Sequence, residues 1–429
     1  MKRATPAARS DPPRTRVLAT LHAVLRRGEP TGVALARALG PIGDRADRAF
    51  LTDLAYGTLR WLPTLDAALA PWLPEPERLP YRVRDALRVG AYERLVRGTP
   101  DHAAVHAWVE VVKRAGDPDA RLAGLVNAVL RRVDLADVRG DAAAVSLSPA
   151  LWHHLRRALG PMAAPAARAM RSPEPLWLTA HRDDAVERLR AEGADVRPGP
   201  LPLSLAVRLQ RPLAETEAFR EGLVQPQNPS SAAVVTALGS VAGRTVLDVG
   251  SGHGVKAAQL AAAGATVLAV EVDPRRAASG RRNLARLGRR VQHHVLDASR
   301  PLGDLPMADA ALLDAPCTGT GTLRGHPEIK LRWRPDDARA AAARQAAMLA
   351  SVADRVAPGG CLVYAVCALG LEEGPEVVAA FLAAQPAWRS VPPQLPLPTH
   401  PAPVGAWLLP DDAGLDGFYV ARLERTGAA

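Results

Sequence analysis

The feature that most constrains the fold is a regular alternation of strand-like and helix-like segments between residues 230 and 429. The strand-like runs are TVLDVG, ATVLAVEVD, RVQHHVLDA, DAALLDAP, CLVYAVCA and GFYVARLER, and helix-like runs lie between them. Strands that alternate with helices favour a mostly parallel sheet covered by helices on both faces. The sequence therefore predicts a doubly wound α/β domain over residues 226–429.

The N-terminal third has a different periodicity. Val17, Leu18, Leu21, Val24 and Leu25 have the spacing of one buried helix face, and four further segments before residue 138 repeat that pattern. We therefore predict an all-helical bundle of five or more helices over residues 1–140. Residues 150–225 mix helix-like and strand-like runs with proline-rich connections, which predicts a small α+β module.

The chain carries a net charge of +10 over 429 residues. Residues 1–140 hold 23 arginines and lysines against 16 acids, a net charge of +7. Positive charge favours a polyanionic partner such as nucleic acid, although a bias toward arginine contributes to it. No apolar run approaches the ~20 residues of a membrane span, so we expect a soluble cytoplasmic protein.

The first predicted strand ends in a glycine-rich loop that resembles a nucleoside-binding turn. Gly250, Gly252 and Gly254 have GxGxG spacing between strand and helix, and Asp248 precedes them. Glycine allows a sharp turn and a close approach of the backbone to a ligand. The spacing differs from the GxGxxG of dinucleotide sites. It resembles the first motif of S-adenosylmethionine-dependent methyltransferases.

Two further acids follow the next strands. Glu271 ends the second strand, where an acid can accept hydrogen bonds from both ribose hydroxyls, with Asp273 as an alternative. Asp297 ends the third strand, where it can contact an adenine amino group. Each could instead cap a helix or turn.

The three cysteines define the chemistry that we expect at the strand ends. Cys317 lies in a DAPC turn with Asp314 just past one strand, and Cys367 ends the next strand, whereas Cys361 opens that strand at the opposite edge and is expected to pack. Cytosine C5 can be activated for methylation by addition of a thiolate at C6. No cysteine or histidine cluster has metal spacing, so we predict no metal.

The motifs together resemble the RsmB/Sun family of bacterial 16S ribosomal RNA cytosine-C5 methyltransferases. The resemblance covers nearly the full length and includes LLDAPCTGTGTLRGHPEIK, LVYAVC and the ending LLP…DGFYVARLER. AYGTLR, HAAVHAWVEVVKRA and LVNAVLRR resemble its NusB-like RNA-binding domain, and GLVQPQNPSSAAVV resembles its linker, with Gln227 on the family's glutamine. The resemblance implies a multidomain enzyme with a NusB-like bundle, a small α+β module and a Rossmann-like S-adenosylmethionine domain.

The resemblance also implies roles for individual residues. Cys367 would be the nucleophile, Cys317 would assist product release, and Asp314 would bind the target cytosine and lie beside the cofactor. Glu271 would contact the ribose and Asp297 the adenine. The cofactor loop would consist of Asp248 and, after it, Gly250, Ser251, Gly252, His253, Gly254, Val255 and Lys256. Its partner would be small-subunit ribosomal RNA that is not fully assembled, and we expect a monomer.

The chain departs from the family pattern near the nucleophile. Val366 and Ala368 replace the hydroxyl residues that flank the family's cysteine, and Gly374 replaces an asparagine. The cofactor loop also lacks the family's Ala-Ala-Pro-Gly-Gly-Lys sequence. These changes bear on cofactor affinity and on activation of Cys367.

A basic stretch after the DAPC turn is the predicted RNA contact. Such a stretch could hold phosphates and stack on a flipped base, or could be a solvated loop. Its proposed RNA-binding residues are Arg324, His326, Lys330, Arg332 and Trp333.

Two other functions fit part of the sequence. One is a non-catalytic RNA-binding or ribosome-assembly protein with a decayed methyltransferase domain. The other is a methyltransferase acting on nitrogen, which would not need Cys367.

Overall fold

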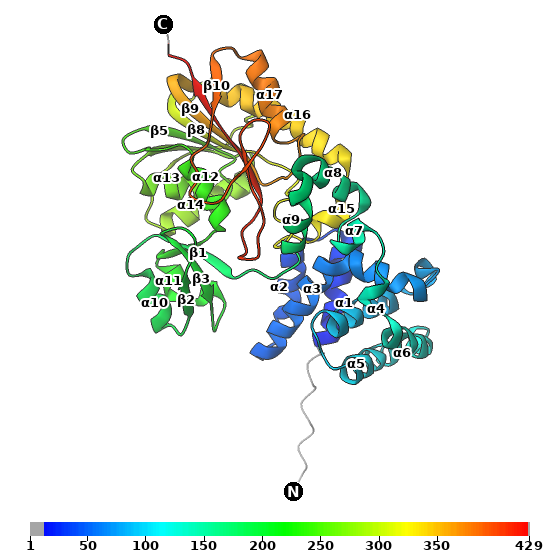
Figure 1. Cartoon of the computed structure of the whole chain (residues 1–429). Coiled ribbons are helices and arrows are strands. Elements are labelled where there is room, and N and C mark those ends of the chain that lie inside the picture. Colours follow the sequence, from blue (N-terminus) through cyan, green and yellow to red (C-terminus); the bar gives the residue numbers. More distant parts are fainter. Residues whose placement is uncertain (1–12, 428–429) are drawn as a thin grey trace. The chain divides into compact units, whose positions relative to one another are not determined.

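A computed structural model describes residues 13–427. The chain divides into two compact units, which we call the helical unit and the sheet unit. The helical unit comprises residues up to 153 together with 167–173 and 323–332, and the sheet unit comprises 154–166, 174–322 and the residues from 333 on. Figure 1 shows the helices and strands in chain order.

The helical unit is built on amphipathic helices around one apolar core. In α1, the predicted face is buried through Val17, Leu21 and Val24, and the central helices α3 and α4 bury much of their length. The predicted all-helical N-terminal region is confirmed. Its main helices are α1 (Pro13–Arg27), α2 (Thr31–Leu39), α3 (Arg45–Leu69), α4 (Tyr81–Leu95), α5 (Asp101–Arg114), α6 (Ala123–Arg132) and α7 (Asp141–Ala144).

A distant part of the chain completes this unit. The segment 323–332, which contains α15 (Ile329–Arg332), belongs to the helical unit although its neighbours in sequence belong to the sheet unit. Leu331 packs against the helical core. Two helices, α8 (Pro149–Leu159) and α9 (Ala163–Ala169), contain residues of both units.

The contact between α3 and α4 is close enough to need a glycine. A Cβ atom at Gly57 would lie 2.0 Å from the Tyr92 ring, and that ring is fixed by a 2.9 Å hydrogen bond from its hydroxyl to Asp53. We expect Gly57→Ala to destabilise the helical unit by about 1–3 kcal/mol through overpacking. Hydrogen exchange should show faster opening of amides in α3 and α4.

The matched control is Gly43→Ala, because a Cβ atom at Gly43 meets nothing within 4 Å. Amides of the central strands of the sheet unit give an internal reference. Equal exchange in the two alanine variants would contradict the packing argument.

The sheet unit begins with a small antiparallel sheet of order β2-β3-β1-β4. Apolar side chains on β1 and β3, including Leu178 and Val207, pack with Leu189 of α10 to form its core. Its elements are β1 (Leu176–Ala180), α10 (Ala185–Ala191), β2 (Asp195–Pro198), β3 (Ser204–Arg208), α11 (Glu217–Arg220) and β4 (Val224–Pro226). The structure groups this module with the large sheet, and the three-domain boundaries remain a prediction.

The large sheet has the order β11-β12-β13-β9-β8-β5-β6-β7, and β10 also pairs with β13. The strands β9, β8, β5, β6 and β7 are parallel neighbours, whereas β13 lies antiparallel to β9. The strands are β5 (Thr245–Val249), β6 (Thr266–Val270), β7 (Gln292–His294), β8 (Ala308–Asp314), β9 (Val356–Val366), β10 (Trp388–Val391), β11 (His400–Pro401), β12 (Ala406–Leu408) and β13 (Phe418–Arg425).

Helices accompany this sheet and confirm the predicted α/β class. They are α12 (Pro229–Thr236), α13 (Val255–Ala262), α14 (Pro274–Arg286), α16 (Pro335–Ala353) and α17 (Pro375–Ala384). Because parallel strands end at the same edge, the segments that follow β5, β6, β8 and β9 come together there. Among residues 13–427, no helix has the length and apolar character needed to cross a membrane.

Candidate active site

The glycine loop after β5 fits closely against its neighbours. Gly250 has a φ of +77°, and its amide donates to Val270 O at 3.0 Å. A Cβ atom at Gly250 would lie 2.3 Å from Asp314 O, so both conformation and space require glycine. Gly254, with a φ of +74°, precedes the first residue of α13. The loop thus presents backbone at the carboxyl edge of the sheet.

Glu271 holds the glycine loop. Its carboxylate accepts hydrogen bonds from the amides of Gly252 and Asp273, each at 2.9 Å. Asp273 accepts from the amide of Arg275 and caps α14. Of the two acids considered for a ribose contact, Glu271 therefore lies at the loop, and Asp273 serves the helix.

Asp297 is engaged in its own turn. Its Oδ1 accepts from the Ser299 amide at 3.0 Å and from the Ser299 hydroxyl at 2.7 Å. These hydrogen bonds lower the pKa of Asp297. Val272 and Leu296, which sequence reasoning did not single out, follow β6 and β7 and are 59% and 39% exposed. Apolar side chains open to solvent at this edge suit the face of a flat ring.

A cavity of about 240 Å³ joins the glycine loop to the end of β8. Asp248 and Lys256 line it, and Asp248 is fully buried. Burial raises the pKa of Asp248 to about 7, while the charge of Lys256 acts in the opposite direction. The other lining residues are Pro226, Gln227, Ser231, Gly250, Ser251, Gly252, His253, Val255 and Asp314. The predicted cofactor loop therefore borders an open space with backbone and carboxylate groups.

Lys256 and Asp314 form an ion pair at the inner end of this cavity. The Lys256 Nζ lies 2.7 Å from Asp314 Oδ2, and Lys256 is 9% exposed. Burial alone would lower the pKa of Lys256, but the nearby carboxylate of Asp314 raises it above its usual value. The lysine therefore remains a cation beside the end of β8.

The two cysteines predicted at the active edge lie side by side. Cys317 Sγ and Cys367 Sγ are 3.3 Å apart, and both residues are partly exposed. Parallel pairing of β8 with β9 brings their ends together, with Asp314 opposite Ala365. Cys361 is buried in the core of the sheet unit, as expected for a packing residue.

The basic stretch after the DAPC turn is turned inward. Arg324 is fully buried and donates to Ala169 O at 2.8 Å. Lys330 is buried and donates to Ser146 O at 2.9 Å, and burial lowers its pKa well below the usual value. These two side chains bind backbone carbonyls of the helical unit, which leaves neither available to RNA in this structure.

The remaining residues of that stretch differ in exposure. Arg332 donates to the carbonyls of Gly28 and Val24, each at 2.8 Å. Trp333 is 8% exposed and packs on the His154 ring at 4.6 Å. The His326 side chain is 62% exposed. Of the five residues predicted to bind RNA, His326 is exposed to solvent, whereas the side chains of Arg324, Lys330, Arg332 and Trp333 contact other parts of the protein.

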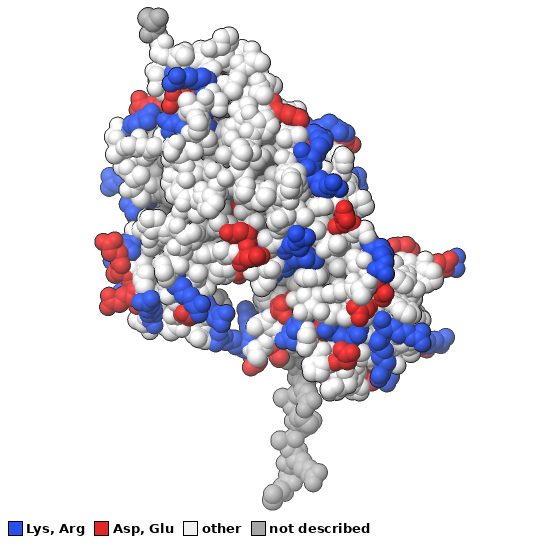
Figure 2. Space-filling view, in the orientation of Figure 1, with Lys and Arg blue, Asp and Glu red and all other residues white. Residues whose placement is uncertain are grey.

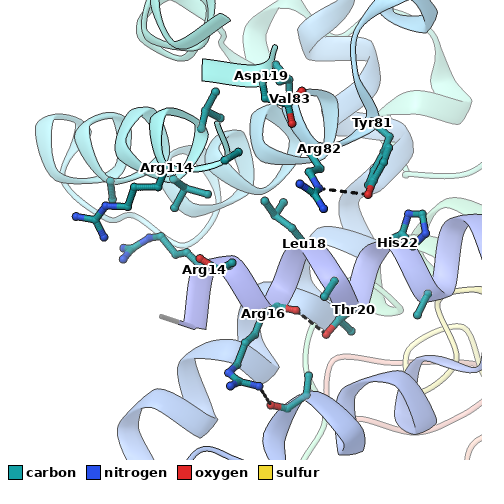
Figure 3. A pocket seen from close by; sticks show the side chains of 18 of the residues that line it. Arg14, Arg16, Leu18, Thr20, His22, Tyr81, Arg82, Val83, Arg114 and Asp119 are labelled. Carbon is teal, nitrogen blue, oxygen red and sulfur yellow. Dashed lines mark hydrogen bonds between the residues drawn. The ribbon is translucent and has the colours of Figure 1, made fainter. Parts of the chain in front are cut away.

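A basic groove of about 1010 Å³ lies among α1, α2, α4 and α5 of the helical unit. Figure 3 shows Arg14, Arg82 and Arg114, from three of these helices, around the same space. His22 stacks on Tyr81 at 4.6 Å within the groove. Its arginines are Arg14, Arg16, Arg27, Arg37, Arg82 and Arg114, and its acids are Glu110 and Asp119. Net charge indicated this unit, but periodicity could not locate the groove.

Figure 2 shows the charged side chains on one face of the molecule. On the face drawn in Figure 2, basic and acidic side chains are interspersed in small groups. Within residues 13–427, no cluster of three or more histidine, cysteine or acidic side chains is arranged to hold a metal ion.

Known proteins are similar to this chain in both sequence and fold. Residues 235–424 match the family described as 16S rRNA methyltransferase RsmB/F, and residues 12–134 match the NusB family. The chain is 42% identical to ribosomal RNA small subunit methyltransferase B of Thermus thermophilus over 98% of this chain and 99% of that protein. It is 33% identical to the protein of that name from Xanthomonas campestris pv. campestris, over 94% of each. The crystal structure of PH0851 shares the fold with a TM-score of 0.77 and 22% identity, over 97% and 99% of the two chains.

A NusB-type helical region joined to a Rossmann-like sheet with this glycine loop defines an S-adenosylmethionine-dependent methyltransferase. The chain belongs to the ribosomal RNA small subunit methyltransferase B family. The sequence-based predictions of family, fold class, enzyme class and cofactor are thereby confirmed.

The residues that depart from the family pattern fit their surroundings in the structure. Val366 and Ala368 are fully buried on either side of Cys367, so apolar side chains suit both positions. A Cβ atom at Gly374 would lie 2.9 Å from the Tyr419 ring. Glycine thus fits the close approach of this turn to β13, where a larger side chain would require Tyr419 to move.

Proposed function

We propose that this enzyme methylates C5 of a cytosine in small-subunit ribosomal RNA through a covalent bond between Cys367 and cytosine C6. The observation that carries the proposal is the pair of cysteines 3.3 Å apart at the ends of β8 and β9. A methyltransferase acting on nitrogen needs no thiol, and two partly exposed thiols at the ends of β8 and β9 favour the carbon reaction.

The cofactor cavity has groups that match S-adenosylmethionine. The glycine loop offers backbone too close to Asp314 for any side chain at Gly250. We assign Glu271 to the ribose hydroxyls, and the exposed Val272 and Leu296 to the face of the adenine. Asp297 remains the proposed partner of the adenine amino group. When bound, S-adenosylmethionine supplies an electrophilic methyl group.

The chain's own residues then make C5 nucleophilic. The Cys367 thiolate bonds to C6, and the electrons of the C5–C6 double bond move toward C5, which takes the methyl group. We assign Asp314 to hydrogen bonds with cytosine N3 and N4 that stabilise the adduct. Lys256 donates a hydrogen bond to the Asp314 carboxylate. Loss of the C5 proton to a base restores the double bond and breaks the C6–S bond. Cys317, in contact with Cys367, assists this release.

The direct test is methyl transfer from labelled S-adenosylmethionine to unmodified small-subunit ribosomal RNA, followed by nucleoside analysis. Label in 5-methylcytidine supports the proposal, whereas label on a nitrogen overturns it. Cofactor binding without transfer to this RNA would favour a non-catalytic RNA-binding function. Comparison of free RNA with assembled small subunits, by the same assay, tests whether the enzyme acts before assembly is complete. Sedimentation of the enzyme alone tests the expected monomer.

We further propose that the groove of the helical unit binds RNA phosphates. Six arginines face two acids there, and the stacked pair His22 and Tyr81 can accompany an unpaired base. We expect Arg82→Glu with Arg114→Glu to weaken RNA binding by roughly 10- to 100-fold at low salt and to reduce its dependence on salt concentration. Fluorescence anisotropy over a range of salt concentrations measures both quantities.

The matched control is Arg121→Glu, since Arg121 lies on the helical unit outside the groove and pairs with Asp117 at 2.8 Å. Affinity for S-adenosylmethionine should be unchanged in every variant. If the control weakens binding as much as the groove variant, overall charge and not the groove determines affinity.

A further inference from the structure

Glu373 is a buried carboxylate that neither the motif comparison nor the cofactor cavity explains. It is fully buried in the turn before α17. Its Oε2 accepts from the Thr318 amide at 2.8 Å and from Gln345 Nε2 at 3.1 Å, and its Oε1 accepts from the Thr318 hydroxyl. Burial raises the pKa of Glu373, and these hydrogen bonds act against the increase. Three converging donors and no acceptor are what an ionised carboxylate requires.

These contacts hold the chain on both sides of Cys317. Gln345, fully buried on α16, donates to Pro316 O at 2.9 Å as well as to Glu373. Glu373 binds Thr318, the residue that follows Cys317. Further along the same loop, the Gly321 amide donates to Cys367 O at 2.8 Å. The position of Cys317 relative to Cys367 is therefore fixed from outside the reacting pair.

The Glu373 carboxylate also acts on the Cys317 thiol. The hydrogen bond with Cys367, burial and nearby negative charge, including that of Glu373, raise the pKa of the Cys317 thiol.

Tyr364 is a further titratable neighbour of Cys317 and Glu373. Its hydroxyl donates to Glu373 O at 2.6 Å, and burial holds its pKa well above the usual value, so it remains neutral. A negative charge beside one thiol of a hydrogen-bonded pair disfavours ionisation of that thiol.

We propose that Glu373 is a positioning residue that fixes the division of roles between the cysteines, by keeping Cys317 as the thiol beside Cys367. Glu373 does this through Thr318, by holding the Cys317 loop and by placing a negative charge beside it. The catalytic meaning of this division rests on the proposed function. In that reaction, a Cys317 thiol beside Cys367 can donate a hydrogen bond to the sulfur that leaves C6.

The division can be tested on the full chain without RNA or cofactor. Iodoacetamide alkylates thiolates with loss of iodide, and mass spectrometry reports the rate at each cysteine under reducing conditions across pH. In wild type we expect Cys367 to react at least about tenfold faster than Cys317, because burial and the Glu373 carboxylate disfavour the Cys317 thiolate. In Glu373→Gln, we expect that ratio to fall about tenfold, toward equal labelling.

Two controls separate this effect from loss of structure. Buried Cys361 should remain unlabelled while the sheet unit is folded. Glu372→Gln removes the neighbouring charge, which pairs with Arg157 at 2.9 Å, and should leave the ratio unchanged. If Glu373→Gln exposes Cys361, Thr318→Ala takes its place, with an expected fall of about threefold for the loss of one hydrogen bond.

Faster labelling of Cys317 in wild type overturns the proposal, as does an unchanged ratio in Glu373→Gln with Cys361 protected. Failure of the proposed function is a separate result. If wild type shows the expected ratio but transfers no methyl group to RNA, the division of roles stands and the cytosine reaction does not.

Discussion

Replacing Cys367 with alanine is expected to abolish methyl transfer to RNA. Without the thiol at this position no bond to cytosine C6 can form, and C5 is not activated. Removal of a nucleophile typically reduces kcat by at least about 10⁴-fold. Single-turnover transfer from labelled S-adenosylmethionine measures the loss, and calorimetric titration of the cofactor verifies that the cavity is intact.

Cys317→Ala is the matched variant, because it removes the other thiol of the same pair. We expect it to accumulate a covalent protein–RNA adduct that survives a denaturing gel. Adduct in Cys367→Ala, and none in Cys317→Ala, would reverse the proposed roles. Full transfer by Cys367→Ala would exclude the covalent mechanism.

Breaking the ion pair between Lys256 and Asp314 should have the second largest effect. The two groups are 2.7 Å apart, and Lys256 is buried. Asp314→Asn leaves that cation without its partner and weakens the hydrogen bonds offered to the cytosine ring. Lys256→Met removes the cation that pairs with the Asp314 carboxylate. Each variant is expected to lower kcat on the order of 10²- to 10³-fold, as for the loss of one charged group from a preorganised site.

The double variant shows whether the pair acts as one unit. If it does, Asp314→Asn combined with Lys256→Met should be little worse than the more damaging single variant. Losses that multiply would mean that the two residues act independently. Thermal unfolding of each variant should be compared, because removing one partner of a buried pair also costs stability.

The main fold and the pairing of the cysteines could be predicted from the sequence for physical reasons. Apolar periodicity determines which face of a helix or strand is buried, and α1 and the parallel strands follow it. Once β8 and β9 are parallel neighbours, Cys317 and Cys367 must lie near each other. A local sequence pattern is therefore enough to predict a contact when that contact follows from the order of the strands.

Other features depend on contacts between distant segments that no local pattern encodes. Arg324 and Lys330 were expected to contact RNA on the basis of their charge. Charge alone does not show whether a side chain is solvated or donates to a buried carbonyl, as both do here. Glu373 carries no local signal of its role, because its partners Thr318 and Gln345 lie 55 and 28 residues away in sequence. Such roles become visible only when the hydrogen bonds are known.

The return of residues 323–332 to the helical unit affects how the protein can be made. As the ribosome releases the chain, the N-terminal helices emerge first, but Lys330 and Leu331, which complete their packing, emerge nearly 200 residues after α7. At ~5–20 residues per second, these helices wait on the order of ten seconds or longer for their last segment. Folding of the N-terminal region is therefore not finished until much of the catalytic sheet has also been synthesised, which links the two units in time as well as in sequence.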